Sequence, residues 1–78
     1  MRDNLPKGVE FRVGASGSEA SHVQSVLFDK ELWTLRDARS WLASHRFVSD
    51  KLYSPANGHF YHFIQRTPGR FSRIRTLT

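Results

Sequence analysis

Cysteine and long apolar runs are both missing from this sequence. Without cysteine, the chain can form neither a disulfide framework nor a thiolate metal site. No stretch approaches eighteen consecutive apolar residues, so no membrane-spanning helix is expected, and the first residues lack the apolar run of a signal peptide. These absences predict a soluble intracellular protein.

Carboxylates are missing from the last third of the chain. Nine of the twelve basic residues are arginines, and the formal net charge is +5. Because the planar guanidinium group suits bidentate contact with phosphate or carboxylate, this composition favours a polyanionic partner. The alternative is that the charge only keeps a small basic protein soluble. After Asp50 the basic residues are Lys51, Arg66, Arg70, Arg73 and Arg75.

The length of 78 residues allows one domain with one core and leaves little material for an enclosed active-site cavity. Ten aromatic residues and an apolar fraction of 38% are enough for that core, whereas a disordered chain is poorer in aromatics. A binding role is therefore favoured over catalysis.

The first third of the chain predicts two strands. Residues 1–8 are punctuated by Asn, Pro and Gly and predict a polar arm. In residues 9–13 apolar positions alternate with Glu10 and Arg12, as in a strand with one buried and one wet face. Residues 14–21 are rich in Gly and Ser and predict a flexible loop that either links strands or contacts a ligand. The apolar run in 22–28 suits a central strand.

The strongest local prediction is a helix over residues 34–46. Thr34 is a good N-cap, and Asp37 follows three residues later in a near-match to the capping box. At about 100° per residue the apolar positions form one stripe that must pack on the sheet. The stripe contains Leu35, Ala38, Trp41 and Leu42, with His45 near its end as a structural histidine.

The rest of the chain predicts strands and turns. The apolar residues in 47–53 precede Asn57-Gly58, which predicts a type I′ hairpin into a strand at 59–66. A turn at 67–69 leads to a last strand at 71–77, next to the 59–66 strand. The predicted order is β-β-α-β-β-β. Residues 9–78 would thus form a single α+β domain with one helix on a mostly antiparallel sheet.

The strand at 59–66 divides its residues between two faces of the sheet. Phe60, His62, Ile64 and Arg66 share one face, and Tyr61 and Phe63 lie on the other with Gln65. If the helix covers Tyr61 and Phe63, the first face is free to stack bases and neutralise phosphates. If the helix covers Phe60 and Ile64, those residues are core. The sequence leaves both assignments open.

Other candidate sites are weaker. Arg36, Arg39 and Arg46 form a row on one flank of the helix, which either extends a basic surface or covers the core edge with methylene groups. His59 and His62 would lie on opposite strand faces, so we predict no metal site. No nucleophile elbow or phosphate-binding loop is present, and we predict no cofactor and no enzymatic activity.

Short motifs follow one another along residues 23–77: a lysine before an aromatic residue, an A-x-x-W-L helix, and an aromatic-rich strand that ends near Gln-Arg and Pro. In this order they resemble a little-characterised family of small domains in bacteriophage and large-virus proteins. The family usually has basic residues where this chain has His62 and Ile64. The matching positions are Lys30, Ala38, Trp41, Leu42, Phe47, Tyr61, Phe63, Gln65, Arg66 and Pro68, and all but Lys30, Gln65 and Arg66 are interpreted first as fold determinants.

The resemblance implies a viral or prophage origin, with a location in the host cytoplasm or on the virion, and no defined activity. Our leading hypothesis is a non-enzymatic accessory protein that binds nucleic acid. The alternative is a phage-encoded protein-interaction module, such as an assembly factor or an inhibitor of a host protein, that binds through the sheet face or edge. The predicted nucleic-acid-binding residues are Arg66, Arg70, Arg73, Arg75, Arg36, Arg39, Phe60 and His62.

Overall fold

The computed structural model describes residues 5–15, 22–66 and 73–77. Its elements in chain order are β1 (Val9–Ala15), β2 (His22–Asp29), α1 (Leu35–Ser44), β3 (Leu52–Tyr53), β4 (Phe60–Ile64) and β5 (Arg73–Leu77). The predicted β-β-α-β-β-β order and the α+β fold class are confirmed. The β3 strand is only two residues long, shorter than the apolar segment that predicted it.

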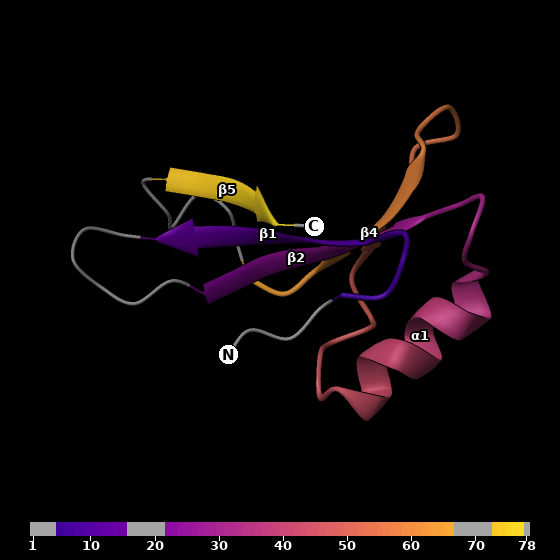
Figure 1. The fold of residues 1–78 in the computed structure, drawn as a ribbon, viewed down its shortest axis with the longest axis horizontal. Coiled ribbons are helices and arrows are strands. Elements are labelled where there is room, and N and C mark those ends of the chain that lie inside the picture. The colour runs from indigo at the N-terminus through magenta and orange to yellow at the C-terminus, as the bar shows by residue number, and fades with distance from the viewer. Residues whose placement is uncertain (1–4, 16–21, 67–72, 78) are drawn as a thin grey trace.

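The five strands form one antiparallel sheet in the order β3-β4-β2-β1-β5 (Figure 1). β2 lies in the centre, as predicted, and its residues 24–28 are all buried. The prediction that the last strand lies next to the 59–66 strand is wrong, because β2 and β1 lie between β4 and β5. β2 pairs with β4 along one edge and with β1 along the other, so neither edge of β2 is left for β5. β5 pairs instead with the edge of β1 that does not face β2.

The start of α1 is set by the predicted cap. The hydroxyl of Thr34 accepts a hydrogen bond from the backbone N–H of Asp37 at 3.0 Å, which satisfies one of the unpaired amides of the first turn. In the apolar stripe, Ala38 and Leu42 are fully buried, and Leu35 and Trp41 pack against the core at its edge.

The end of α1 lies at Ser44, two residues before the predicted end, because Arg46 takes a left-handed conformation with φ of 63°. The N–H groups of Arg46 and Phe47 donate to the carbonyls of Ala43 and Leu42, at 3.2 and 2.8 Å. This is the Schellman arrangement, which usually has glycine where this chain has Arg46. It reverses the chain so that Phe47 packs against the core.

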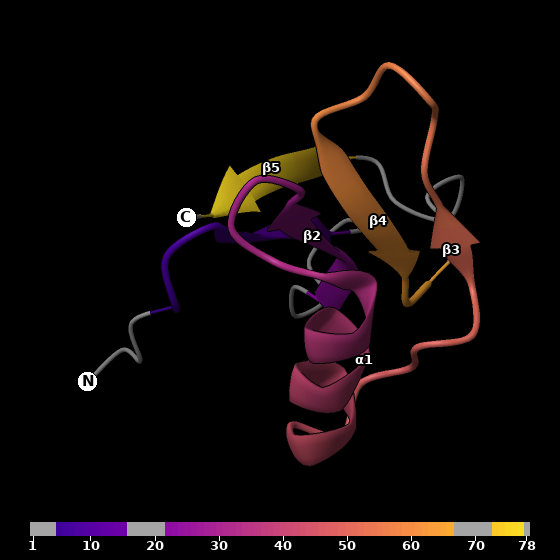
Figure 2. The same ribbon diagram turned by 90° about the vertical axis from the view of Figure 1, so that its right-hand side faces the viewer.

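The helix covers one face of the sheet (Figures 1 and 2). The buried core between them joins Ala38 and Leu42 to Phe28 and Phe63, with Tyr61 packed against its edge. Of the two assignments left open by the sequence, the helix therefore covers the face of Tyr61 and Phe63. The face of Phe60 and His62 lies on the other side.

Residues 5–8 are anchored to the domain, so the described half of the predicted polar arm is not free. Leu5 packs against the core, and the indole N–H of Trp33 donates to the carbonyl of Lys7 at 2.8 Å. Gly8 has φ of 84°, and a Cβ atom there would lie 3.0 Å from the Leu32 side chain. Glycine is required at this turn for both reasons. Residues 1–4 lie outside the described residues.

Two predicted turns need correction. Gly14 and Ala15 were expected to begin the loop, but they belong to β1, because the backbone of Gly14 pairs with strands on both sides. The remainder of that loop, 16–21, lies outside the described residues, as does the turn predicted at 67–69. The type I′ turn at Asn57-Gly58 is wrong, since neither residue has a positive φ. The backbone N–H of Gly58 donates instead to the carbonyl of Pro55 at 3.0 Å. The connection between β3 and β4 is longer than a two-residue hairpin loop, so its backbone does not need the positive φ angles of a type I′ turn.

Two residues from the family-like motifs, Gln65 and Lys30, stabilise loops. The Gln65 side-chain amide accepts from the backbone N–H of Val48 and donates to its carbonyl, both at 2.7 Å, as a neighbouring strand would do. The amine of Lys30 donates to the carbonyl of Pro55 at 3.0 Å and lies 5.5 Å from the centre of the Tyr61 ring. Both side chains thus have structural roles that the sequence did not reveal.

Candidate nucleic-acid interface

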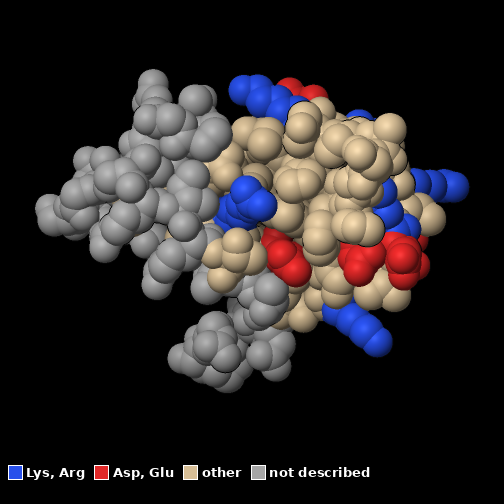
Figure 3. All heavy atoms as spheres, turned by 90° about the horizontal axis from the view of Figure 1, so that it is seen from above, with Lys and Arg blue, Asp and Glu red and all other residues tan. Residues whose placement is uncertain are grey.

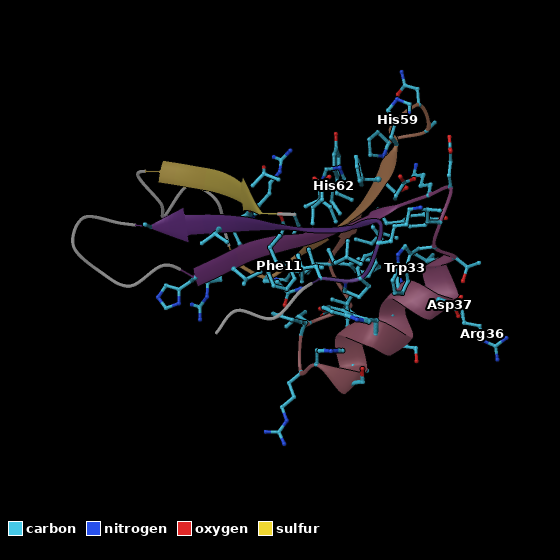
Figure 4. The ribbon with its side chains drawn as sticks, viewed as in Figure 1. Phe11, Trp33, Arg36, Asp37, His59 and His62 are labelled. Atoms are coloured by element: carbon cyan, nitrogen blue, oxygen red, sulfur yellow. The ribbon has the colours of Figure 1, made fainter. Side chains whose placement is uncertain are left out.

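The sheet face opposite α1, here called the second face, is built from alternate residues of adjacent strands. Its register pairs Tyr53 with His62, His62 with Leu27, and Leu27 with Glu10 across four strands. Side chains of directly paired residues lie on the same side of an antiparallel sheet. Figure 4 shows His62 on this side, away from α1, while Phe11 and Trp33 lie on the helix side. The face also contains Arg12, Ser25, Asp29, Phe60 and Ile64.

Three rings form a cluster at one end of the second face. The His62 ring lies 5.6 Å from the Tyr53 ring and 6.5 Å from the Phe60 ring, measured between centroids. Both pairs are T-shaped, with interplanar angles of 67° and 77°. Tyr53 is 60% exposed, although it is one of the largest apolar side chains in the described chain. The cluster therefore presents aromatic surface to solvent.

Among the described residues no helix packs on the second face, yet its central side chains are buried. Leu27, which pairs with His62 on β4 and Glu10 on β1, is only 3% exposed. Ser25, in the next row, is 2% exposed, and its hydroxyl donates to the side-chain oxygen of Gln24 at 3.0 Å. The accessible aromatic part of the second face therefore lies at its β3–β4 end, where Tyr53, Phe60 and His62 are exposed or half-buried.

The surroundings of His62 favour its neutral form. Partial burial lowers the pKa of His62 below its ordinary value of 6.5, and the positive charges of Arg12 and Lys30 lower this pKa further. A neutral imidazole is suited to stacking.

Charged side chains of both signs lie around a mostly uncharged surface on this side of the molecule (Figure 3). Arg12 is exposed and pairs across the sheet with Ser25, while Glu10 and Asp29 pair with Leu27 and Phe60. The second face is therefore an aromatic surface with separate cations and carboxylates, not a uniform field of arginine.

Arg66 is positioned by an irregularity in the sheet. The register between β1 and β2 shifts at Gln24, whose side-chain amide is buried and donates to the carbonyl of Arg66 at 3.0 Å. The backbone carbonyl of Gln24 accepts from the N–H of Arg66 at 3.1 Å. Two hydrogen bonds thus fix the Arg66 backbone at the end of β4, and its side chain is exposed.

The predicted arginines of the helix lie elsewhere. Arg36 projects from the far side of α1 (Figure 4), so the structure does not bring it together with Phe60 and His62. Arg39 donates to the carbonyl of Ser49 at 3.4 Å, and its guanidinium carbon lies 5.9 Å from the centre of the Phe63 ring. Arg39 therefore covers the edge of the core, the structural alternative considered for this row.

The remaining predicted arginines lie toward the C-terminus. Arg73 and Arg75 are in β5, where their backbones pair with Ala15 and Val13 of β1. This strand is at the sheet edge opposite to β3, and β2 and β1 separate it from His62 on β4. Arg70 lies outside the described residues.

Tyr53 and Arg12 were missed as candidate residues. The alternation in residues 9–13 placed Arg12 on the wet side of a strand, and Tyr53 was counted only among apolar residues. Neither position suggests a site until the strand order places β3 and β1 on the two sides of the β4–β2 pair.

Two other kinds of site find no support in the described chain. Residues 5–15, 22–66 and 73–77 contain no group of three or more His, Asp or Glu side chains arranged to hold a metal ion. In the same residues, no helix has the length and apolar character needed to cross a membrane. His45 stacks on Trp41 at 3.9 Å and its Nδ1 lies 2.8 Å from the Trp41 carbonyl oxygen, which is a structural role.

Comparison of this chain with protein-family models, with curated proteins and with solved structures finds no match in any of the three.

Proposed function

We propose that this protein is a non-enzymatic accessory protein that binds nucleic acid through the second face of its sheet, and that it is of phage or prophage origin. The origin rests on the motif order along residues 23–77. The binding function rests on the residues of the face itself.

One observation carries the proposed function: the helix packs on Tyr61 and Phe63, which leaves the rings of Phe60 and His62 on the other side of the sheet with Tyr53. Nucleic acid offers both planar bases and phosphates, so a binding surface needs aromatic rings next to cations. Arg12 on β1 and Arg66 after β4 supply exposed guanidinium groups. The net charge of +5 adds long-range attraction for a polyanion.

The arginines are not equivalent in this proposal. Arg12 and Arg66 belong to the binding surface, and Arg73 and Arg75 extend the basic segment along the edge strand. Arg36 and Arg39 belong to the helix side and are left out.

The proposal is tested by a pair of double variants with equal loss of charge. Arg12→Gln/Arg66→Gln removes the cation of the second face and the one that follows β4, and Arg36→Gln/Arg46→Gln removes two exposed cations of the helix side. Binding of labelled DNA and RNA is followed by fluorescence anisotropy between 50 and 200 mM salt. We expect the first variant to bind more weakly, with the slope of log K against log salt reduced by about 1.5, because each lost phosphate contact lowers it by about 0.7 to 0.9.

We expect the helix-side variant to keep the slope of the unmodified protein. Equal losses from both variants would mean that only net charge matters and would contradict a defined surface. Absence of binding by the unmodified protein at low salt would overturn the proposed function.

A second candidate function is docking to a protein. It is favoured by the 60% exposure of Tyr53 and by the largely uncharged surface in Figure 3. An assembly factor or an inhibitor of a host protein would use the same face, and its binding would depend only weakly on salt. The salt titration therefore separates the two functions.

A further inference from the structure

The rings of the second face are arranged to contact planar groups that approach from solvent. His62 is T-shaped to both Tyr53 and Phe60, so the cluster has ring faces and ring edges within one small area. The cluster spans only β3 and β4, and the neighbouring Leu27 on β2 is buried at 3% exposure, so the rings themselves supply the accessible apolar surface. An unstacked base fits a surface of this kind because it is planar and uncharged.

The charges around the rings fit a chain in which bases alternate with phosphates. Arg12 lies on β1, three strands from Tyr53 on β3, and Arg66 follows β4. Neighbouring strands are about 4.8 Å apart, so the span from Tyr53 to Arg12 is about 14 Å. Aromatic sheet surfaces in other folds stack two or three bases. The second face is long enough for a similar number. Both cations lie toward the Ser25 end of the strands, because Arg12 pairs with Ser25 and the Arg66 backbone is hydrogen-bonded to Gln24.

The carboxylates argue against a double helix as the ligand. Glu10 and Asp29 lie on the same face as the rings, where a duplex would bring a dense row of phosphates against them. A duplex also hides the faces of its bases, so the rings of Tyr53, Phe60 and His62 would have nothing to stack on. A single strand can place its bases over the rings and direct its phosphates toward Arg12 and Arg66.

We infer that the ligand of the second face is single-stranded nucleic acid, bound across the strands with two or three unpaired bases against Tyr53, His62 and Phe60. This inference rests on the proposed nucleic-acid-binding function and deepens it. The ring cluster supplies the preference for a single strand, and the arginines supply most of the salt dependence.

The test compares single-stranded and duplex ligands of equal length. It also compares a variant of an exposed side chain on the second face with a variant of an exposed side chain outside it. Anisotropy is measured for labelled ten-nucleotide strands of thymidine and of riboadenosine and for a ten-base-pair duplex, at low salt. Tyr53→Leu removes one ring and keeps an apolar side chain in the short β3 strand. Val48→Ala is the control, since its side chain is 45% exposed and belongs to the segment that contacts Gln65, outside the second face.

We expect both single strands to bind more tightly than the duplex, and Tyr53→Leu to weaken single-strand binding by about 5- to 150-fold, the range for stacking one base on an aromatic ring. Duplex binding by Tyr53→Leu should stay unchanged, as should all binding by Val48→Ala. His62→Ala is a second variant with the same expectation. Trp33 and Trp41 both pack on the helix side, so their fluorescence monitors folding of every variant without contacting the ligand.

The two levels of the proposal fail in different ways. If the duplex binds as tightly as the strands, or if Tyr53→Leu and His62→Ala bind single strands normally, base stacking is overturned while nucleic-acid binding stands. If no nucleic acid binds at low salt, both are overturned.

Discussion

Phe63 and His62 are neighbours in β4, yet they lie on opposite faces of the sheet in very different surroundings. Phe63 has no exposed surface and contacts Phe28 edge to face at 5.7 Å beneath the helix. His62 makes ring contacts at similar distances to Tyr53 and Phe60, but these rings remain partly open to solvent. One face has been closed by the helix, and the other carries comparable aromatic groups without that cover.

This difference has an energetic meaning. Aromatic side chains on the helix side stabilise the fold because folding removes their apolar surface from water. Partly exposed rings contribute less to stability and retain apolar surface that a ligand can cover. Removing a ring should therefore affect folding on one side of β4 and binding on the other.

The largest expected effect comes from Phe63→Ala, compared with His62→Ala at the next position. Loss of the fully buried ring leaves a cavity between sheet and helix, and we expect the free energy of unfolding to fall by about 3 to 5 kcal/mol. For His62→Ala we expect a loss below about 1 kcal/mol, because the ring is partly exposed. Urea unfolding followed by tryptophan fluorescence measures both.

Phe63→Leu keeps most of the buried volume and should lose less than Phe63→Ala, which checks that the cost comes from the cavity. Similar losses for the alanine variants at 62 and 63 would contradict the difference between the two faces.

Local patterns in the sequence predicted the parts of the fold that depend on near neighbours. Thr34 and Asp37 predicted the start of the helix, and the apolar run at 22–28 predicted the central strand. Both signals are local, because an N-cap and a buried strand each depend on residue types within a few consecutive positions. The alternation at 59–66 separated the two sets of side chains correctly. It could not say which set faces the helix, since that depends on how α1 returns to the sheet.

The candidate site was only partly predictable. Phe60, His62 and Arg66 share a strand, so their alternation groups them. Tyr53 and Arg12 join His62 only through pairing with β3 and through the order of β2 and β1, which involve residues distant in sequence. The same strand order separates Arg73 and Arg75 from β4, and Arg36 and Arg39 belong to an element on the other side.

A smaller effect is expected at Gln24, which is hydrogen-bonded to the backbone of Arg66 just after β4. Gln24→Leu removes the hydrogen bond to the Arg66 carbonyl and leaves the buried Ser25 hydroxyl without its acceptor. We expect the free energy of unfolding to fall by about 1 to 3 kcal/mol, the cost of unpaired buried polar groups. Thermal or urea unfolding measures the loss.

Ser25→Ala is the matched control for Gln24→Leu, because it leaves only one buried group, the side-chain oxygen of Gln24, without its partner. It should cost about 1 kcal/mol, the lower end of the penalty for a buried unpaired group. If Gln24→Leu costs no more than Ser25→Ala, the contact with Arg66 adds no stability. If Gln24→Leu also reduces the salt dependence of nucleic-acid binding, then positioning of Arg66 links the buried network to the second face.

The smallest expected effect is the pH dependence of stability that His62 contributes. The pKa of His62 is below 6.5 in the folded protein, mainly through burial and then through the charges of Arg12 and Lys30. Between that lowered pKa and 6.5 the unfolded chain binds more protons than the folded one. The free energy of unfolding must therefore fall as pH falls below about 6.5, and His62 causes no such loss above it.

His62→Gln isolates this contribution, because the other histidines are common to both proteins and cancel in the difference. Urea midpoints are measured for both proteins from pH 8 to pH 5. On acidification below about 6.5, the unmodified protein should lose more stability than His62→Gln. If it instead gains stability relative to the variant, the imidazolium form has a favourable partner in the folded state. The ring would then be charged in the range where a neutral stacking surface is required, and the second face would bind phosphate through His62 instead of bases.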